Sequence, residues 1–307
     1  MTTYLITGGT GFIGAHVARR LVERGREVVL FDVAPREDRV ADVRDDVTIV
    51  QGDIRRPEQL ARVFETHDID RVCHLASLLG AESEEDPPRS IGINVEGTSY
   101  VYDLAATHGV ERFVNTSSIA VYGYHPPAAV ERVTEEAPRR PNILYASCKL
   151  VNEDLGKRYA ESGMTVSTVR FGSVFGPGRD TGASGFTTAI VEKPARGDPV
   201  TVPGIGEPNW VYVEDAAAGV VHLAEERGDG GYEEYNLASE IAPLRRAADL
   251  VRDRIPDADI TITDAQPETL PGVWMRMDTS KLEAAGFTPA YDLEAGIEAH
   301  LAALDTA

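Results

Sequence analysis

The sequence predicts an α/β fold in which a doubly wound parallel sheet carries a smaller C-terminal α/β lobe. Three observations lead to this prediction. Apolar strands alternate with helical segments through the first 170 residues, a glycine-rich turn joins the first strand to the first helix, and the alternation stops after Arg170. Such alternation produces parallel strands that helices cover on both faces.

The elements of the first half follow from short apolar runs and from helical spacing of apolar residues. The runs predict strands at Tyr4–Thr7, Val28–Phe31, Val47–Gln51, Arg71–Ala76, Arg112–Thr116 and Thr165–Arg170. The helical spacing predicts helices at Phe12–Arg24, Pro57–Thr66, Ser90–His108 and Asn142–Glu161.

The second half does not continue the regular alternation of strands and helices. Gly172–Gly185 holds five glycines and one proline and predicts a loop, whereas Val200–Glu240 predicts short strands around one helix. The predicted helices of this half are Glu214–Glu226, Ala242–Arg254, Ser280–Ala285 and Leu293–Ala303. We therefore expect a larger domain at residues 1–170, with return segments from the C-terminal half, and a smaller lobe at residues 171–307.

Charge and composition exclude several classes of partner. The chain has 50 acidic and 30 basic residues, only four of them lysines, and a net charge of −20. This balance argues against binding nucleic acid or an anionic membrane, because both need basic surfaces. We interpret the acidity as a solvated, lysine-poor surface, as in salt-adapted proteins, rather than as an acidic partner-binding face.

The sequence also lacks the patterns of a membrane helix, a disulfide framework and a metal site. No apolar run reaches the roughly 18 residues of a membrane helix, and we expect no signal peptide, because the glycine turn begins at residue 8. Two cysteines, Cys73 and Cys148, are too few for a disulfide framework, so we expect reduced thiols in a cytoplasmic protein. The histidines follow no metal-ligand spacing, so no metal is expected.

The glycine turn, TGGTGFIG at residues 7–14, predicts a phosphate site. Gly9, Gly11 and Gly14 fit G-x-G-x-x-G, whereas Gly8, Gly11 and Gly14 fit G-x-x-G-x-x-G, with Gly9 then a flexible filler. Either spacing brings backbone N–H groups and the positive end of a helix dipole to the pyrophosphate of a dinucleotide. Residues 1–170 are therefore predicted to form a dinucleotide-binding Rossmann domain.

Two acidic residues indicate which dinucleotide is bound. Asp32 closes the second strand at about the spacing at which a carboxylate accepts both ribose hydroxyls, and it would repel the 2′-phosphate of NADP. This favours NAD, with NADP as the alternative because Arg36 could approach such a phosphate. Asp53 follows the third strand, where it could meet the adenine amine or instead stand at the entry of the next helix.

Ser118, Tyr145 and Lys149 are the candidate catalytic residues. Tyr145 and Lys149 are four residues apart and share one face of a predicted helix. A neighbouring ammonium favours the phenolate, so we expect the pKa of Tyr145 to fall from about 10 toward neutrality, which would make it a base. The hydroxyl of Ser118, at the end of a strand, could hold the substrate oxygen.

With these residues in place, the chain resembles an extended short-chain dehydrogenase/reductase of the NAD-dependent epimerase/dehydratase family, from Tyr4 to about Leu301. The motifs that carry the resemblance are GGTGFIG at residues 8–14, HLAS at 74–77, NVEGT at 94–98, TSSIAVYG at 116–123, YASCK at 145–149, RFGSVFGP at 170–177 and VED at 213–215.

The resemblance implies roles for particular residues. It favours the spacing that uses Gly8, makes Ser118 rather than Ser117 catalytic, makes Tyr145 the acid/base, and lets Lys149 hold the nicotinamide ribose. It also implies a homodimer through a four-helix bundle built from Asn94–His108 and Asn142–Glu161. The residues expected at the cofactor are Gly8, Gly11, Phe12, Ile13, Gly14, Asp32, Asp53, Ile54, Leu75, Ala76, Ser77, Asn94, Tyr145, Lys149, Phe171 and Ser173.

Residues that the chain lacks reduce the number of reactions that we expect it to catalyse. Dehydratases and decarboxylases of this family have an acidic residue shortly after the catalytic Ser or Thr, where this chain has Ile119 and Ala120. Nucleotide-sugar epimerases usually have Asn at Ser173, and at Pro208 an Arg that binds diphosphate. We therefore expect an NAD-dependent dehydrogenase of a small sugar-like or hydroxy-acid substrate. The alternatives are a nucleotide-sugar 4-epimerase with tightly bound NAD and a non-catalytic NAD-binding regulator.

Six side chains are expected to shape the substrate pocket. They are Ser118, Ser173, Arg179, Trp210, Trp274 and Arg276. Arg179 or Arg276 could replace the guanidinium missing at residue 208. For Trp210 the alternative is a place in the core of the lobe, and for Arg276 it is surface pairing with Asp278.

Overall fold

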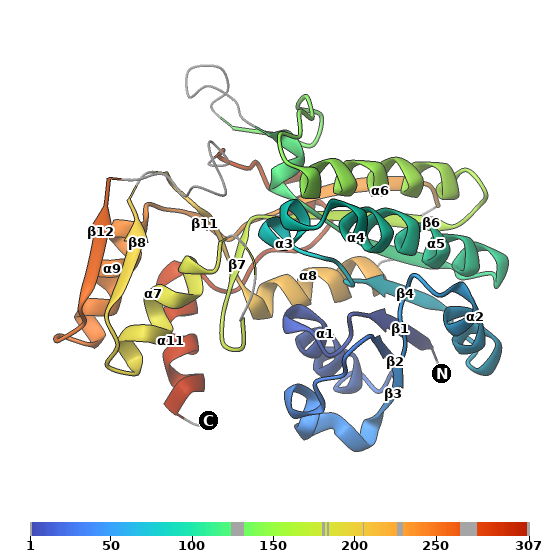
Figure 1. The fold of residues 1–307 in the computed structure, drawn as a ribbon, viewed down its shortest axis with the longest axis horizontal. Coiled ribbons are helices and arrows are strands. Elements are labelled where there is room, and N and C mark those ends of the chain that lie inside the picture. Colours follow the sequence, from blue (N-terminus) through green and yellow to red (C-terminus); the bar gives the residue numbers. More distant parts are fainter. Residues whose placement is uncertain are drawn as a thin grey trace.

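The computed structural model describes residues 2–123, 132–179, 182, 184–204, 206–225, 230–264 and 275–305. It contains a large sheet with helices on both faces and a smaller lobe beside it (Figure 1). The large sheet has seven parallel strands in the order β10-β6-β5-β4-β1-β2-β3. The predicted doubly wound parallel sheet is therefore confirmed.

The strands of this sheet end at a common edge. Their bounds are β1 Thr3–Thr7, β2 Glu27–Asp32, β3 Val47–Gln51, β4 Arg71–His74, β5 Arg112–Ser118, β6 Thr165–Phe171 and β10 Tyr232–Leu237. Thr7 pairs with Phe31 on one side and with His74 on the other, so the carboxyl ends of β1, β2 and β4 lie together. In open α/β sheets this edge is where ligands bind.

Two helical layers cover the sheet. Helices α1 (Phe12–Val22) and α8 (Val213–Glu225) lie on one face, and α2 (Pro57–Thr66), α5 (Thr98–Thr107) and α6 (Leu144–Ala160) lie on the other (Figure 1). Because side chains alternate along a strand, β1 serves both layers. Tyr4 and Ile6 pack in the α1/α8 core, and Leu5 packs in the opposite one.

The predicted helix at residues 90–108 differs in detail. It consists of α4 (Pro87–Ile91), a π-helical turn (Gly92–Gly97) and α5, and it follows another short helix, α3 (Gly80–Glu85). A Cβ atom on Gly97 would lie 2.7 Å from a side-chain carbon of Ile54, so the chain passes unusually close to the segment after β3. A π-helical turn of this kind is frequent at functional sites.

The smaller lobe holds two short sheets and several helices. Strands β11 (Glu240–Ile241), β9 (Asn209–Tyr212) and β7 (Ser173–Phe175) form one sheet, and β12 (Ile260–Thr263) pairs with β8 (Val200–Pro203). The helices of the lobe are α7 (Phe186–Ala195), α9 (Leu244–Arg254) and α11 (Leu293–Asp305), whereas α10 (Ser280–Ala284) packs against β10 of the large sheet.

The lobe corrects one prediction and contains two elements that were not predicted, strand β12 and helix α7. The segment at residues 172–185 is not entirely loop, because β7 lies inside it and pairs with β9. Its three residues carry no periodic signal among the glycines, and Phe175 is held by an edge-to-face contact with Trp210 at 5.3 Å. Helix α7 was not predicted; it begins with Phe-Thr-Thr and contains Pro194, residues with weak or unfavourable helix propensity.

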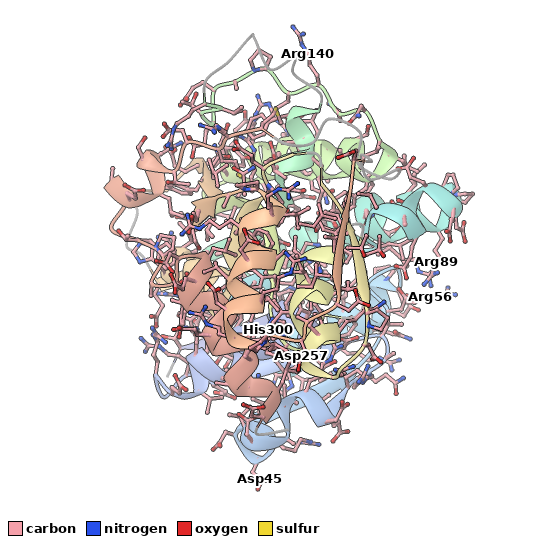
Figure 2. All side chains as sticks on the ribbon, turned by 90° about the vertical axis from the view of Figure 1, so that its left-hand side faces the viewer. Asp45, Arg56, Arg89, Arg140, Asp257 and His300 are labelled. Carbon is pink, nitrogen blue, oxygen red and sulfur yellow. The ribbon has the colours of Figure 1, made fainter. Side chains whose placement is uncertain are left out.

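The chain returns from the lobe to the large sheet after strand β9. After the lobe strand β9, α8 packs against α1, and β10 then pairs with β6 at the edge of the large sheet. Viewed from the lobe side, the molecule extends from Arg140 at one extreme to Asp45 at the other (Figure 2). Within the described part of the chain, no helix is both long and apolar enough to cross a membrane.

Candidate active site

The glycine turn between β1 and α1 is built around close backbone contacts. Gly8 has φ +66°, and a Cβ atom there would lie 2.9 Å from the backbone nitrogen of Ala76. On Gly14 it would lie 2.2 Å from the carbonyl oxygen of Gly8, which excludes any side chain. Gly9 is also required, since its Cβ would lie 2.8 Å from the carbonyl oxygen of Ile6. The expectation that Gly9 is only a flexible filler is therefore corrected.

The N-terminus of α1 is open toward ligands. Gly11 caps this helix with extended backbone geometry, and no side chain accepts a hydrogen bond from its first turn. The first N–H groups of the helix are therefore not used by a capping side chain and carry the positive end of the helix dipole. Together with the Cβ-free cradle, these groups fit the pyrophosphate of a dinucleotide.

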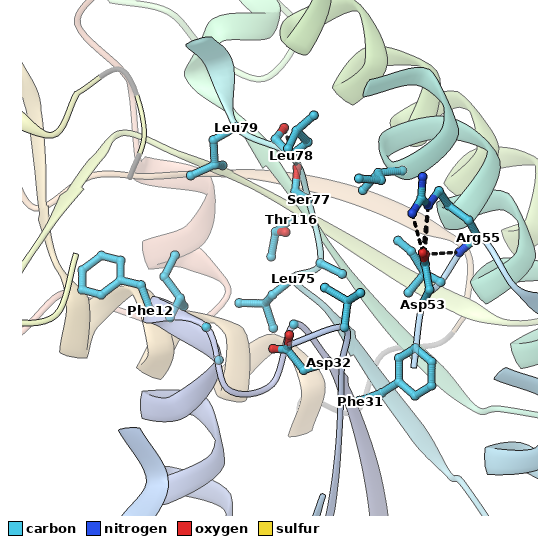
Figure 3. A pocket seen from close by; sticks show the side chains of 18 of the residues that line it. Phe12, Phe31, Asp32, Asp53, Arg55, Leu75, Ser77, Leu78, Leu79 and Thr116 are labelled. Carbon is cyan, nitrogen blue, oxygen red and sulfur yellow. Dashed lines mark hydrogen bonds and ion pairs between the residues drawn. The ribbon is translucent and has the colours of Figure 1, made fainter. Parts of the chain in front are cut away.

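A pocket of about 400 Å³ lies above the strand ends and the glycine turn (Figure 3). Nearly all the residues expected at the cofactor line it: Gly8, Gly11, Phe12, Ile13, Gly14, Asp32, Asp53, Ile54, Leu75, Ala76, Ser77, Tyr145, Lys149 and Phe171. Asn94 and Ser173 do not. Ser173 lies buried in β7, on the lobe side of the strand ends.

The two acidic residues of the pocket are held differently. The carboxylate of Asp32 accepts hydrogen bonds from the backbone N–H and the hydroxyl of Thr10, at 3.2 and 2.8 Å. Asp53 instead pairs with the guanidinium of Arg55, which lowers the pKa of its carboxyl group (Figure 3). The N-cap residue of α2 is Arg56, so Asp53 does not cap that helix.

Asn94 supports the pocket from behind. Its side chain accepts a hydrogen bond from the backbone N–H of Leu78 at 2.7 Å and donates one to the carbonyl oxygen of the same residue at 2.9 Å. His74 is fully buried and bonds the hydroxyls of Thr7 and Thr98, at 2.6 and 2.9 Å. Asn94 therefore holds the backbone that borders the pocket, and His74 joins β1 to α5.

Ser118, Tyr145 and Lys149 converge where β5 ends beside α6. The Ser118 side chain lies within reach of the Tyr145 hydroxyl, where its hydrogen bonding lowers the pKa of Tyr145. The ammonium of Lys149 is 3% exposed, donates to the carbonyl oxygen of Thr116 at 2.8 Å, and lies 5.6 Å from the centre of the Tyr145 ring. The hydroxyl of Ser117 instead donates to Glu153 at 2.6 Å, so Ser118 is the serine that reaches Tyr145.

The expected pKa shift of Tyr145 is wrong for the protein alone. Burial raises the pKa of Tyr145 to about 12, although the hydrogen bond with Ser118 and the charge of Arg179 oppose this rise. Burial also lowers the pKa of Lys149 to about 8. The Lys149 ammonium lies near the Tyr145 ring rather than at its hydroxyl. The loss of water on burial therefore raises the pKa of Tyr145 more than the positive charge of Lys149 could lower it.

The residues expected to contact substrate have different surroundings. Arg179, on the segment after β7, donates to the Val174 carbonyl oxygen and to the Ser184 hydroxyl, and its charge acts on Tyr145. Arg276 is exposed and pairs with Glu207 at 2.7 Å rather than with Asp278. Trp274 lies outside the described residues.

Trp210 is a core residue. It is 0% exposed, and its indole N–H donates to the carbonyl oxygen of Ala242 at 2.8 Å. A fully buried ring with its polar atom satisfied has no surface to offer a ligand, so the expectation that Trp210 contacts substrate is corrected.

Comparison with known proteins identifies the group to which the chain is related. The sequence profile of the NAD-dependent epimerase/dehydratase family matches residues 4–238. The chain belongs to this family. Since the family is NAD-dependent, the cofactor expected from the glycine turn and Asp32 is confirmed as NAD.

Relatives within the family carry out different reactions. The chain is 30% identical, over 77% of its length and 74% of the relative's, to a UDP-N-acetyl-α-D-glucosaminuronate decarboxylase of Bacillus cytotoxicus. It is 28% identical to a D-erythronate dehydrogenase of Cupriavidus necator, over 97% of both chains. The UDP-glucose 4-epimerase of Thermus thermophilus, solved with NAD, superposes with a TM-score of 0.88 at 28% identity, covering both chains completely. The family is established, and the reaction differs among these relatives.

Three residues of the site were not predicted from the sequence. Arg39 lines the pocket and donates to the carbonyl oxygen of Gly178 at 2.9 Å, a contact between residues 139 positions apart. Glu84, in the short helix α3, accepts from the backbone N–H groups of Leu144 and Tyr145 at the start of α6. Glu153 could have been noticed, because it lies two helical turns beyond Tyr145 on the same face.

Proposed function

We propose that the protein is an NAD-dependent dehydrogenase that oxidises a carbinol carbon of a small sugar-like or hydroxy-acid substrate. The observation that carries this proposal is the positive charge of Arg179, which lowers the pKa of Tyr145 while its guanidinium donates to the Val174 carbonyl oxygen and the Ser184 hydroxyl. A cation beside the acid/base group suits a substrate with a carboxylate close to the reacting carbon.

Features of the substrate side favour a small molecule over a nucleotide sugar. Pro208 is buried, and its carbonyl oxygen accepts from the backbone N–H of Ala242, so this position offers no guanidinium to a diphosphate. Arg276 is engaged with Glu207 at the surface. In the proposed pocket, the available cation is therefore Arg179, which acts near the reacting carbon, rather than a guanidinium at the more distant diphosphate position.

The proposed chemistry uses the three converging side chains. Ser118 holds the substrate hydroxyl, and Tyr145, as phenolate, accepts its proton. NAD, when bound, supplies the nicotinamide that takes the hydride from the same carbon. Lys149 keeps a positive charge near the phenolate and would hold the nicotinamide ribose, while Arg179 orients the substrate's acid group. The products are a ketone or an oxidised sugar, NADH and one proton.

The wider setting is part of the same proposal. We assign residues 1–170, with the returning segment that ends in β10, to the NAD-binding domain and residues 171–307 to the substrate lobe. The protein would act in the cytoplasm, where its two buried free cysteines, Cys73 and Cys148, stay reduced. It would be a homodimer that pairs α5 and α6 with the same helices of a second copy.

A nucleotide-sugar 4-epimerase is the second candidate. The observation in its favour is the superposition of the whole chain on the Thermus thermophilus epimerase. An epimerase returns its hydride to the same substrate, so it retains NAD through purification and needs none added.

Cofactor exchange separates the two candidates. The purified protein is assayed for bound NAD, then mixed with NAD and a panel of aldoses, sugar acids and hydroxy acids while NADH absorbance is followed. The dehydrogenase proposal expects NADH to accumulate with a carboxylate-bearing substrate and not in an Arg179→Gln variant. No NADH with any substrate, combined with thermal stabilisation by UDP, would overturn it in favour of the epimerase.

A further inference from the structure

Helix α6 carries three functional side chains, each one turn from the next. Tyr145, Lys149 and Glu153 are spaced four residues apart and therefore share one face. The Glu153 carboxylate and the Arg170 guanidinium of β6 are both 0% exposed. They form a two-pronged pair, with Nε to Oε1 at 2.9 Å and Nη2 to Oε2 at 2.8 Å.

The polar atoms of this pair are well satisfied by their neighbours. The Nη1 atom of Arg170 donates to the Tyr122 hydroxyl at 2.7 Å and to the Glu135 carbonyl oxygen at 3.0 Å. On the other side, the Ser117 hydroxyl donates to Glu153. Burying two charges costs free energy, and apolar residues of similar size often stabilise a fold as well or better. Stability alone therefore gives little reason for this pair.

The pair is connected to the candidate catalytic lysine through β5. Two consecutive residues of that strand each hold α6: the Thr116 carbonyl oxygen accepts from Lys149, and the Ser117 hydroxyl donates to Glu153. A shift of α6 along the strand would break both contacts together. Glu153 is also one helical turn from Lys149 along α6.

We propose that Glu153 and Arg170 are positioning residues that fix α6 on the β5–β6 edge and hold Lys149 charged beside Tyr145. The negative charge of Glu153 raises the pKa of Lys149 and so opposes the lowering by burial. The inference rests on the proposed function only for the catalytic use of Lys149, because the placement and charge of this lysine can be measured without a substrate.

Several other groups face Lys149 and must be considered in any titration. From its own helix these are Tyr145 and Cys148, and from β4 it is His74, whose pKa the lysine helps to lower. His74 is held neutral by burial, with its pKa lowered to about 3, and burial raises the pKa of Cys148. Near neutral pH, Glu153 is therefore the charged partner whose removal should act on Lys149 most directly.

The chain suits a direct measurement because it contains only four lysines. Protein labelled with ¹³C at the lysine ε carbons is titrated by NMR, and Lys149 is assigned with a Lys149→Arg variant. In Glu153→Gln we expect the Lys149 ionisation constant to rise at least about tenfold, one pH unit, because an attractive charge has been removed. Glu153→Asp keeps the charge but shortens the arm, so Lys149 should titrate nearly as in the wild type.

Two variants provide the controls. Asp154→Asn changes the neighbouring carboxylate, which is exposed and pairs with Lys157, so only the Lys157 signal should move. Glu153→Met/Arg170→Met removes both buried charges, so it avoids leaving Arg170 without its two-pronged partner if Glu153→Gln does not fold. We expect this double variant to fold, to titrate Lys149 at lower pH and to bind NAD more weakly.

Turnover provides a second readout. With a substrate found in the panel, we expect kcat of the double variant to fall by about 10²-fold, as displaced catalytic groups do, with a smaller change in KM. A double variant that does not fold, or that folds with wild-type Lys149 titration and NAD affinity, overturns the inference. If the substrate panel fails while Lys149 shifts as expected, the proposed function fails and the positioning role stands.

Discussion

At the scale of single residues, exclusion of water changes the acidity of the pocket side chains most. The pKa of Tyr145 rises to about 12 and that of Lys149 falls to about 8, so their ordinary order is reversed by a wide margin in the protein alone. Further positive charge must enter the pocket and lower the pKa of Tyr145 before this residue can act as a base. Arg179 and Ser118 already lower its pKa, and the positively charged nicotinamide of NAD would act in the same direction.

Removal of the Tyr145 hydroxyl tests its assigned role. In Tyr145→Phe we expect kcat to fall by about 10²- to 10⁴-fold, because no other group is placed to take the substrate proton. NAD affinity, measured by calorimetry, should change little. The matched control is Tyr100→Phe, at a tyrosine on α5 that bonds Glu96. Wild-type turnover in Tyr145→Phe would remove this residue from catalysis.

His74 should leave a pH signature in stability. Its pKa is lowered from 6.5 to about 3 in the folded protein. Between these values the unfolded chain binds a proton that the folded chain does not, so stability is lost as the pH falls through this range. From about pH 7 to about pH 5 we expect His74→Asn to lose about 2 kcal/mol less free energy of unfolding than the wild type. Urea titrations at each pH measure this, and parallel curves for the two proteins would rule out His74 as the source.

At the scale of elements, α6 has two faces with separate tasks. Its inner face carries Tyr145, Lys149 and Glu153 against the sheet, and its outer face carries Val151, which is 43% exposed. A large apolar side chain exposed on a helix is ordinary by itself. Helix α5 packs alongside α6, so the two helices together offer a broad face for a second copy of the chain.

A charge at Val151 tests the proposed dimer. We expect Val151→Glu to convert a dimer into a monomer in light scattering, because two copies of the carboxylate would be buried near each other. Thr201→Glu, on an exposed position of β8, adds the same charge away from these helices and should leave the mass unchanged. A wild-type protein that is already monomeric at micromolar concentration contradicts the dimer.

At the scale of the whole molecule, acidic charge dominates. The net charge is −20 and the isoelectric point is about 4.7, so the folded chain repels itself at neutral pH. Surface pairs such as Arg19–Asp42 and Arg254–Glu294 relieve this only locally.

Salt should therefore stabilise the protein. The distance over which charges act shrinks from about 10 Å at 0.1 M salt to about 3 Å at 1 M. At neutral pH we expect Tm to rise by at least about 2 °C between these KCl concentrations, and by much less near the isoelectric point. A Tm that falls with KCl at neutral pH would mean that the surface ion pairs outweigh the general repulsion.

Much of the sheet and the cofactor pocket could be predicted because their signals are local. A short apolar strand, a glycine turn and a helix occur within about 20 positions, and Asp32 follows at a spacing that the sheet geometry imposes. Strand β7 could not be predicted in this way, because three residues are too few to show a periodic pattern and their strand conformation depends on pairing with β9. The role of Trp210 also needed the structure, because an aromatic residue can serve equally in a core or in a pocket.

The sequence by itself predicted the family and the parallel sheet, and it favoured NAD over NADP, because each prediction depends on residues close together or at regular spacing. Only the tertiary structure decided how burial reverses the acidities of Tyr145 and Lys149, and that Glu153 meets Arg170. These depend on water exclusion and on contacts between β5, β6 and α6, and neither is recorded in the spacing of residues along the chain.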